Sequence, residues 1–251
     1  MNCIKLRYLA IVGLLVLLTS GCATTKLAPD TVSRFKKVGV ISLTAHEFHR
    51  RYTGLTIFGN EREKGDISAW KVDDEYELQM QSALSKLGLF EAVIVPYERK
   101  EFYPVYNITG PWDAPAFRKE WGNVEEELKG FARKHSLDAV VMVIWRESDD
   151  FLAGTNQRIR GAGFYARGVG DLTAVSVIHL ISSVGVIDGQ PGKHIATMGL
   201  VFTKKVAPEL ARATFAGLYE TKIAEVRTML IDLPKDGWEQ KFMKIFMSDI
   251  N

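Results

Sequence analysis

The chain has 251 residues, of which 47% are hydrophobic and 25% are charged. This composition is typical of a folded globular protein, and it excludes wholesale disorder, collagen and coiled coil. The 32 basic and 30 acidic residues give a formal net charge of +2, which offers no strongly basic surface for nucleic acid. Two cysteines are too few for a disulfide-dense scaffold.

The first 22 residues have the organisation of an export signal. Lys5 and Arg7 precede the uncharged stretch YLAIVGLLVLL at residues 8–18, and small residues follow up to Gly21. A basic start, a short apolar stretch and a small-residue end are typical of a secretory signal peptide. The apolar stretch is too short to cross a bilayer as a helix, because a crossing takes roughly 20 residues.

The end of this signal, LTSGC at residues 18–22, resembles the lipobox of bacterial lipoproteins. The resemblance implies cleavage after Gly21, lipid on the sulfur of Cys22 and acylation of the new amino terminus. Ala23 stands where lipoproteins kept in the inner membrane often carry Asp, which implies the periplasmic face of the outer membrane. The alternatives are a simple signal peptide cut near Gly21 and an uncleaved anchor.

Removal of residues 1–21 takes away Lys5, Arg7 and no acid, so 230 residues remain with 30 basic and 30 acidic side chains. Cys3 is discarded and Cys22 carries lipid, so we expect a mature chain with neither a reactive thiol nor a cysteine metal ligand. We expect a signal peptide at residues 1–21, a lipidated tether at 22–34 and a periplasmic α/β domain at 35–251.

The mature chain alternates between apolar runs and amphipathic stretches. In its first half the pattern predicts a strand at 37–43, a hairpin from 52–58 and 66–72, a helix from Asp73 as cap to Gly88, a strand at 89–95 and an irregular excursion at 97–117. In its second half it predicts a helix from Asn123, a buried strand at 138–145, a glycine- and arginine-rich loop at 154–170, long strands at 171–187 and 193–203, a helix from Pro208 to Leu233 and a last helix around Trp238.

This order predicts a single compact three-layer α/β domain with a mixed sheet and a long carboxyl-terminal hairpin followed by helices. It resembles a group of periplasmic proteins that share one such domain: the curli-secretion lipoprotein, the lipoprotein activators of penicillin-binding proteins and the amino-terminal domain of the Tol-Pal translocation protein. The matching parts are KKVGVISL, ELQMQSALSKLGLFEAVIV, HSLDAVVMVIW and VIDGQPGKHIAT, within residues 35–230. Residues 44–72 and 97–121 depart from the pattern.

Two motifs invite a cofactor interpretation that the spacing does not support. His46 and His49 lie three residues apart, whereas HExxH requires four, so we interpret them as part of a polar loop and predict no metal site. Gly161 and Gly163 lack the third glycine of a dinucleotide motif, and no phosphate-binding loop sequence occurs. We therefore expect no cofactor.

The stretch around these glycines contains residue types that dominate binding hot spots. A plain flexible loop is the alternative, and the arginines disfavour lipid-facing strands of a pore. The candidate partner-binding residues are Arg158, Arg160, Phe164, Tyr165 and Arg167.

No catalytic residue is predicted, because Gly-x-Ser-x-Gly is absent and the paired acids Asp73-Asp74 and Asp149-Asp150 suit other roles. We expect an outer-membrane-anchored, non-enzymatic binding or assembly factor with a protein partner in the envelope and no nucleic acid. The alternatives are a homo-oligomeric subunit of a secretion channel or ring, and an envelope hydrolase or metal-dependent enzyme.

Overall fold

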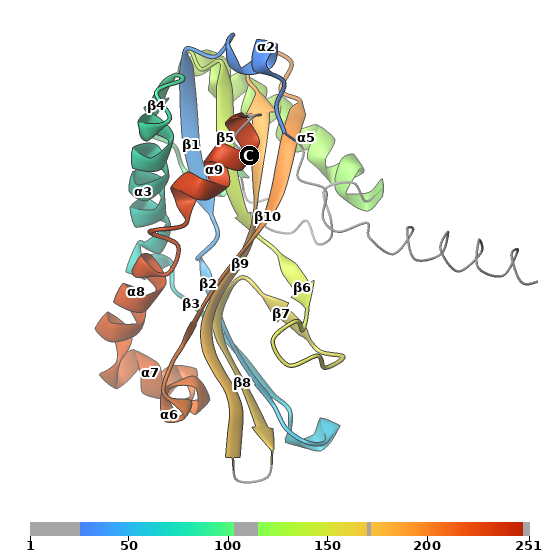
Figure 1. The fold of residues 1–251 in the computed structure, drawn as a ribbon, viewed down its shortest axis with the longest axis vertical. Helices are drawn as coiled ribbons and strands as arrows, with labels where there is room; N and C mark the ends of the chain where they lie inside the picture. Colours follow the sequence, from blue (N-terminus) through green and yellow to red (C-terminus); the bar gives the residue numbers. More distant parts are fainter. Residues whose placement is uncertain (1–25, 103–114, 170–171, 248–251) are drawn as a thin grey trace, which may run out of the picture.

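The computed structural model describes residues 26–102, 115–169 and 172–247, and it confirms the predicted α/β fold class. A mixed eight-stranded sheet runs through the molecule, with helices on both of its faces (Figure 1). The long carboxyl-terminal hairpin is present as β9 (Leu172–Asp188) and β10 (His194–Lys205), and helices follow it as expected.

The strands follow the order β3-β2-β8-β9-β5-β1-β4, and β10 pairs with the other edge of β9. Besides the hairpin, the strands are β1 (Lys37–Leu43), β2 (Glu47–Thr53), β3 (Glu61–Asp66), β4 (Glu91–Val93), β5 (Ala139–Trp145) and β8 (Ala162–Val169). β1 pairs in parallel with β4 and β5, and β2 pairs in parallel with β8. The remaining pairs are antiparallel.

β9 is long enough to serve two partners along one edge. Its residues 182–188 pair with β5, whereas its residues 172–180 pair with β8. The sheet therefore branches into an upper half (β4, β1 and β5) and a lower half (β3, β2 and β8). β1 belongs to the upper half and β2 to the lower half, so the chain crosses the branch at residues 44–46.

Three helices cover one face of the sheet, on the left in Figure 1: α3 (Val72–Lys86), α8 (Ile223–Asp232) and α9 (Trp238–Phe246). Tyr76, Met80 and Trp238 are fully buried there. Periodic apolar side chains give each helix one face to bury, and this burial drives the layer together.

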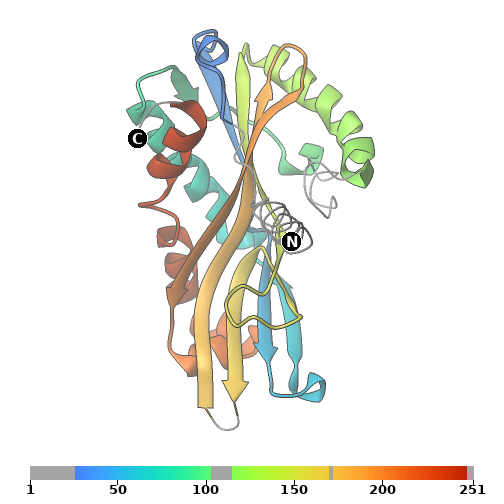
Figure 2. The same ribbon diagram turned by 45° about the vertical axis from the view of Figure 1, so that its right-hand side comes forward.

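The opposite face is covered by two different elements. In the upper half α5 (Pro115–Lys134) packs Leu128 and Phe131 into a core with the apolar side chains of β5 (Figure 2). In the lower half the hairpin of β6 (Glu147–Asp149) and β7 (Arg158–Arg160) lies over Tyr165 of β8. In the described residues, no helix is both long and apolar enough to span a membrane.

The second part of the predicted tether is packed onto the domain. The short helix α2 (Pro29–Val32) lies at the top of the molecule in Figure 1. Leu27 and Val32 are buried in the main core, and the Leu27 N–H donates to the carbonyl of Ile245 at 2.9 Å. The chain is therefore attached to the fold from Leu27 onward.

The predicted hairpin of residues 52–58 and 66–72 is wrong in register. β2 pairs instead with β3. His46 lies in the connection before β2, as predicted, whereas His49 lies in β2 rather than in a loop. β3 reads EREKGD and has no apolar face, because it is an edge strand with water on one side. Charged side chains on an edge strand prevent pairing with other chains, and they also remove the alternation that predicts a strand.

Most of the glycine-rich segment that was predicted as a loop at 154–170 is strand: residues 158–160 form β7 and residues 162–169 form β8. Residues 154–157 are irregular, and residue 170 lies outside the described residues. The glycines of the segment let the backbones of neighbouring strands approach: a Cβ at Gly163 would clash with the backbone carbonyl of His49 in β2. Glycine is unfavourable in strands, so the glycine-rich composition predicted a loop. The structure has a strand there because glycine leaves room for β8 to approach the backbone of β2.

Helix boundaries account for the remaining differences. α5 begins at Pro115, eight residues before the predicted Asn123. The single helix predicted from Pro208 is three: α6 (Pro208–Arg212), α7 (Phe215–Thr221) and α8. Thr214 causes the first break, because its hydroxyl accepts from the N–H of Gly217 and caps α7. Short 3-10 turns at Ile57–Gly59, Ser68–Trp70 and Arg99–Phe102 complete the described fold.

We predict that Gly163→Ala lowers the free energy of unfolding by on the order of 3 kcal/mol, because β8 has to move away from the backbone of His49. Gly130→Ala is the matched control, since Gly130 lies in α5 with open space at its Cβ, and about 1 kcal/mol of stabilisation is expected there. Urea unfolding of both variants measures the difference, and equal effects would refute the close-approach explanation.

Candidate functional site

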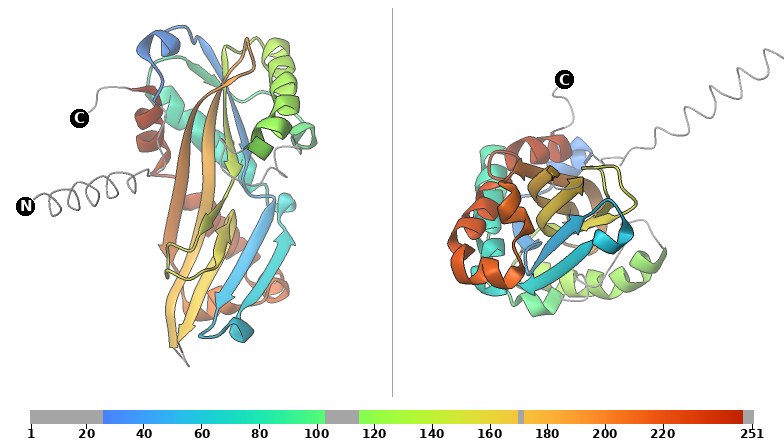
Figure 3. Two further views of the ribbon diagram at one scale, coloured as in Figure 1. Left: turned by 90° about the vertical axis from the view of Figure 1, so that its right-hand side faces the viewer. Right: turned by 90° about the horizontal axis from the view of Figure 1, so that it is seen from below.

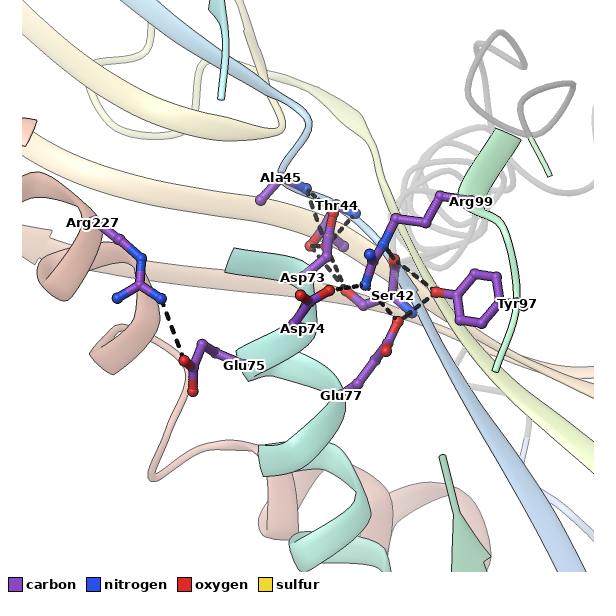
Figure 4. Close-up of polar contacts among 10 residues, drawn as sticks. All are labelled: Ser42, Thr44, Ala45, Asp73, Asp74, Glu75, Glu77, Tyr97, Arg99 and Arg227. Carbon is purple, nitrogen blue, oxygen red and sulfur yellow. Dashed lines mark hydrogen bonds and ion pairs between the residues drawn. The ribbon is translucent and has the colours of Figure 1, made fainter. Parts of the chain in front are cut away.

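A buried polar cluster lies where β1 ends and α3 begins (Figure 4). We call it the branch cluster; its members are Ser42, Thr44, Asp73, Glu77, Tyr97 and Arg99. β1 lies between β4 and β5, and the connections to them, through α3 and α5, cover opposite faces of the sheet. In α/β sheets, ligands bind outside the carboxyl ends of strands at such a reversal of strand order, which makes this cluster the leading candidate site.

The carboxylate of Asp73 holds the chain where it crosses from β1 to β2. It accepts from the hydroxyl of Ser42 at 2.6 Å, from the N–H and hydroxyl of Thr44 at 2.9 and 2.8 Å, and from the N–H of Ala45 at 3.2 Å. Residues 44 and 45 lie between two strands, so they have no ladder partner for these N–H groups. In a continuous strand these N–H groups would donate to carbonyls of a neighbouring strand. At the branch of the sheet they donate to the carboxylate of Asp73 instead.

Asp73 was predicted to cap α3, and that prediction is wrong. The helix starts one residue earlier at Val72, and its N-cap is Lys71, which has φ of 52° and makes no side-chain capping bond. Asp73 is only 5% exposed because its side chain points into the sheet.

Glu77 lies one helical turn beyond Asp73 and faces the same strand end. Its carboxylate accepts from the backbone N–H of Ser42 at 3.0 Å, from the guanidinium of Arg99 at 3.1 Å and from the hydroxyl of Tyr97. Burial raises the pKa of Glu77 to about 7, although the bonds from Tyr97 and Ser42 oppose that rise. Burial likewise raises the pKa of the Tyr97 hydroxyl, so it stays protonated as a donor.

Ion pairs at the rim fasten the surrounding elements to α3. Arg99 pairs with Asp74 at 2.6 Å, and Arg227 of α8 pairs with Glu75 at 3.3 Å (Figure 4). Arg227 also donates to the carbonyl of Trp70 at 2.6 Å. The first turn of α3 is thereby joined to β1, to the segment after β4 and to α8.

The chemistry available to the branch cluster is proton exchange at Glu77 near neutral pH. A carboxyl group with such a pKa has the strength of a general acid or base. However, the side chain of Glu77 is only 6% exposed, and its oxygens accept from groups of the protein itself. The arrangement therefore joins α3 to the sheet and presents no reactive atom to a substrate.

Sequence reasoning missed Glu77, Tyr97 and Arg99. A signal for the first was present, because Asp73 and Glu77 are separated by four residues and continue the buried helical stripe of Met80 and Leu84. Two acids on the buried face of a helix must meet donors. Tyr97 and Arg99 come from a segment with no regular pattern, so nothing in the sequence indicated their role.

Of the two histidines of the rejected metal motif, His46 precedes β2 and His49 lies on it; Gly163 of β8 lies between His49 and His179 of β9. Burial lowers the pKa of His49 to about 4 and that of His179 to about 3. The Nε2–H of His179 donates to the carbonyl of Arg160, and the guanidinium of Arg160 stacks on Trp145 at 3.9 Å. Within the described part of the chain, no group of three or more His, Cys, Asp or Glu is placed to hold a metal ion.

The five candidate partner-binding residues do not form one surface. Phe164 and Tyr165 are both 0% exposed, and they point to opposite faces of β8. Arg160 stacks on Trp145, and Arg167 donates to the carbonyl of Ala153 at 2.6 Å. Of the five, only Arg158 on β7 has an exposed side chain.

A hollow of about 400 Å³ lies away from the branch cluster, at the end of α5. It is lined in part by Arg133, Ser136, Asp138 and Gln190. The Asp138 carboxylate accepts from the N–H groups of Lys36 and Lys37 at 2.8 and 2.9 Å, so it joins two strands rather than facing a ligand.

We predict that Asp73→Ala costs about 3 kcal/mol of unfolding free energy, because it leaves the N–H groups of Thr44 and Ala45 buried without an acceptor. Asp74→Ala is the control: it removes a neighbouring carboxylate whose side chain is 46% exposed, and an effect under about 1 kcal/mol is expected. Denaturant midpoints of the two variants give the comparison. Similar losses would contradict the role assigned to Asp73.

We predict opposite pH effects for His49→Gln and Glu77→Gln. The folded state holds His49 neutral, so wild-type protein loses stability as pH falls from 6.5 towards 4, by about 2 kcal/mol from His49 at pH 5. His49→Gln should remove that loss.

The folded state favours the protonated form of Glu77. This preference stabilises the fold below pH 4.5, and the stabilisation is lost as the pH rises to 7. The stability of Glu77→Gln relative to wild type should therefore increase over that range.

Thermal unfolding at pH 4.5, 5.5 and 7 measures both trends. If either variant runs parallel to wild type at all three values, the burial assigned to that residue is refuted.

No protein-family model and no curated protein matches the chain. Among solved structures, it resembles the PelC dodecamer from Paraburkholderia phytofirmans (11% identity, TM-score 0.32, covering 86% of this chain and 92% of that one). It also resembles protein XCC0632 from Xanthomonas campestris, of family model DUF330 (7%, 0.37, 83% and 81%), and lipoprotein GNA1162 from Neisseria meningitidis (11%, 0.31, 78% and 99%). Likeness at this level concerns the fold alone.

Proposed function

We propose that this chain is a lipoprotein anchored to the periplasmic face of the outer membrane, where it acts as a non-enzymatic binding or assembly factor. The observation that carries the proposal is the sequence LTSGC at residues 18–22, which ends four residues before the first described residue, Lys26. A lipobox placed directly before a folded domain is what an acyl-anchored protein requires. Several acyl chains hold a protein on a membrane far more firmly than one.

The non-enzymatic part of the proposal is supported by the branch cluster. Its two acids, Asp73 and Glu77, accept hydrogen bonds from the backbone and side chains that they hold in place. A catalytic acid or base must instead reach the proton that it moves. The cluster is built to stabilise the branch of the sheet.

The surface that we assign to a protein partner is the turn between β2 and β3. Phe58 is 93% exposed and Leu55 is 66% exposed. The turn that contains them, between β2 and β3, lies towards the bottom of the molecule in Figure 1. Large apolar side chains that gather on a surface are characteristic of protein contacts. Arg158, an exposed member of the sequence-based set, lies on β7 in the same half of the molecule.

A photo-reactive residue at position 58 tests the partner in intact cells, with the same residue in place of exposed Glu127 on α5 as control. We expect a discrete adduct from position 58 and none from 127. An adduct with the mass of two copies would identify self-association instead. No adduct at either position would contradict the assigned surface.

We predict that Cys22→Ala abolishes incorporation of labelled palmitate and moves the protein from the outer-membrane fraction to the soluble or inner-membrane fractions. The cause is the loss of the sulfur to which lipid is attached. Metabolic labelling and sucrose-gradient fractionation measure the two effects, and Thr19→Ala serves as the matched control in the same motif. Palmitate on the Cys22→Ala protein would refute lipidation at this site.

A further inference from the structure

The tether between the lipid and the fold is very short, provided that Cys22 carries lipid as proposed. Leu27 is already bonded to Ile245, so only residues 23–26 separate the acylated residue from the fold. An extended chain of four residues spans at most about 14 Å. A domain of this size has a radius of gyration of about 17 Å, so the tether is too short for the domain to turn its far side to the membrane.

The side of the molecule where the chain enters the fold is made of three segments. The segment at 26–36 meets the end of α9 through the Leu27–Ile245 bond, and the start of α9 meets β10 through Trp238 and Phe202, whose rings are 5.4 Å apart. We call this the entry side. In the left view of Figure 3, β10 and α9 lie towards the left of the molecule and α5 lies on the right.

The entry side is basic, although the mature chain is neutral overall. Residues 26–36, 194–205 and 238–247 contain seven Lys or Arg and two Asp or Glu. Six of the seven basic side chains are exposed: Lys26, Arg34, Lys36, Lys204, Lys205 and Lys244. One of the two acids, Glu239, is paired with Lys86 of α3 at 3.1 Å, and one of the basic residues, Arg34, is paired with Asp188 of β9 at 3.7 Å. The two pairs each remove one charge, so the excess of basic over acidic side chains on the entry side is unchanged.

Basic side chains near a membrane are attracted by anionic lipid headgroups, and each changes the affinity about fivefold when it lies within roughly 10 Å of the surface. The tether holds Leu27 and the adjoining end of α9 close to the membrane, whereas β10 has to be drawn to it by its charge. Val201 of β10, at 44% exposure, adds an apolar side chain to the entry side. Tether length and charge thus select the same side of the molecule.

We propose that the entry side lies against an anionic lipid surface and that α5 faces away from it. This inference rests on the proposed lipidation of Cys22 and adds the orientation of the domain. The β2–β3 turn, at the end of the long axis away from α2, then extends along or away from the membrane, where a partner can reach it.

The mature chain suits a direct test, because its one cysteine is acylated and an added cysteine is labelled alone. Single cysteines replace Thr203 on β10, Gln240 on α9 and Glu127 on α5, all of them exposed. Each full-length lipoprotein is labelled with a fluorophore and reconstituted in vesicles of phosphatidylethanolamine and phosphatidylglycerol that carry a headgroup quencher. We expect strong quenching at positions 203 and 240 and little at 127.

Salt and tether length separate the two causes. At 1 M salt we expect quenching to fall at position 203 and to persist at 240, since charge orients the first and the tether holds the second. A twelve-residue Gly/Ser insertion after Ala23, which adds about 19 Å of flexible reach, should keep the contrast at low salt and lose it at high salt.

Equal quenching at 203 and 127, or stronger quenching at 127, would overturn the proposal. Shielding at 203 that disappears at one copy per vesicle would assign the entry side to a second copy and would overturn it too. A protein without palmitate that does not float with the vesicles would refute the proposed function itself, whereas a lipidated protein without contrast refutes only the orientation.

Discussion

The whole fold depends on the carboxylate of Asp73, which accepts hydrogen bonds from the chain where it crosses the branch in the sheet. β9 pairs with β5 over one half of its length and with β8 over the other, so the chain must step from β1 to β2 without a continuous ladder. The N–H groups of Thr44 and Ala45 are buried at that step, and Asp73 accepts from both. Since buried N–H groups without acceptors are costly, the position of α3 and the branch of the sheet are determined together.

Around this branch the protein buries groups of opposite pH response. Glu77 favours its protonated form in the fold, whereas His49 and His179 favour their neutral forms. Lowering the pH therefore increases the contribution of Glu77 to stability and decreases that of the two histidines, which bind protons more readily in the unfolded chain. The two effects partly cancel between about pH 4.5 and 6.5. Stability near neutral pH then depends mainly on the apolar layers under α3, α8 and α9.

Periodic apolar residues made much of the architecture predictable. The strand at Lys37–Leu43, the helix that ends at Lys86 and the long hairpin of β9 and β10 were found because burial on one or both faces produces a regular pattern. β3 and β8 were missed for opposite reasons. β3 is charged because it is an edge strand, and β8 is rich in glycine because Gly163 lies against the backbone of His49. In both strands contact with neighbours overrides local preference.

The sequence by itself determined the charge balance and the α/β class, and it predicts an export signal and a lipid site at Cys22, because these features depend on residues that are adjacent or periodic along the chain. Only the tertiary structure decided the role of Asp73, the burial of Phe164 and Tyr165, and the grouping of basic residues on the entry side. Each of these brings together segments separated by tens of residues or more. Such contacts follow from strand order and register, which depend on the packing of the entire sheet.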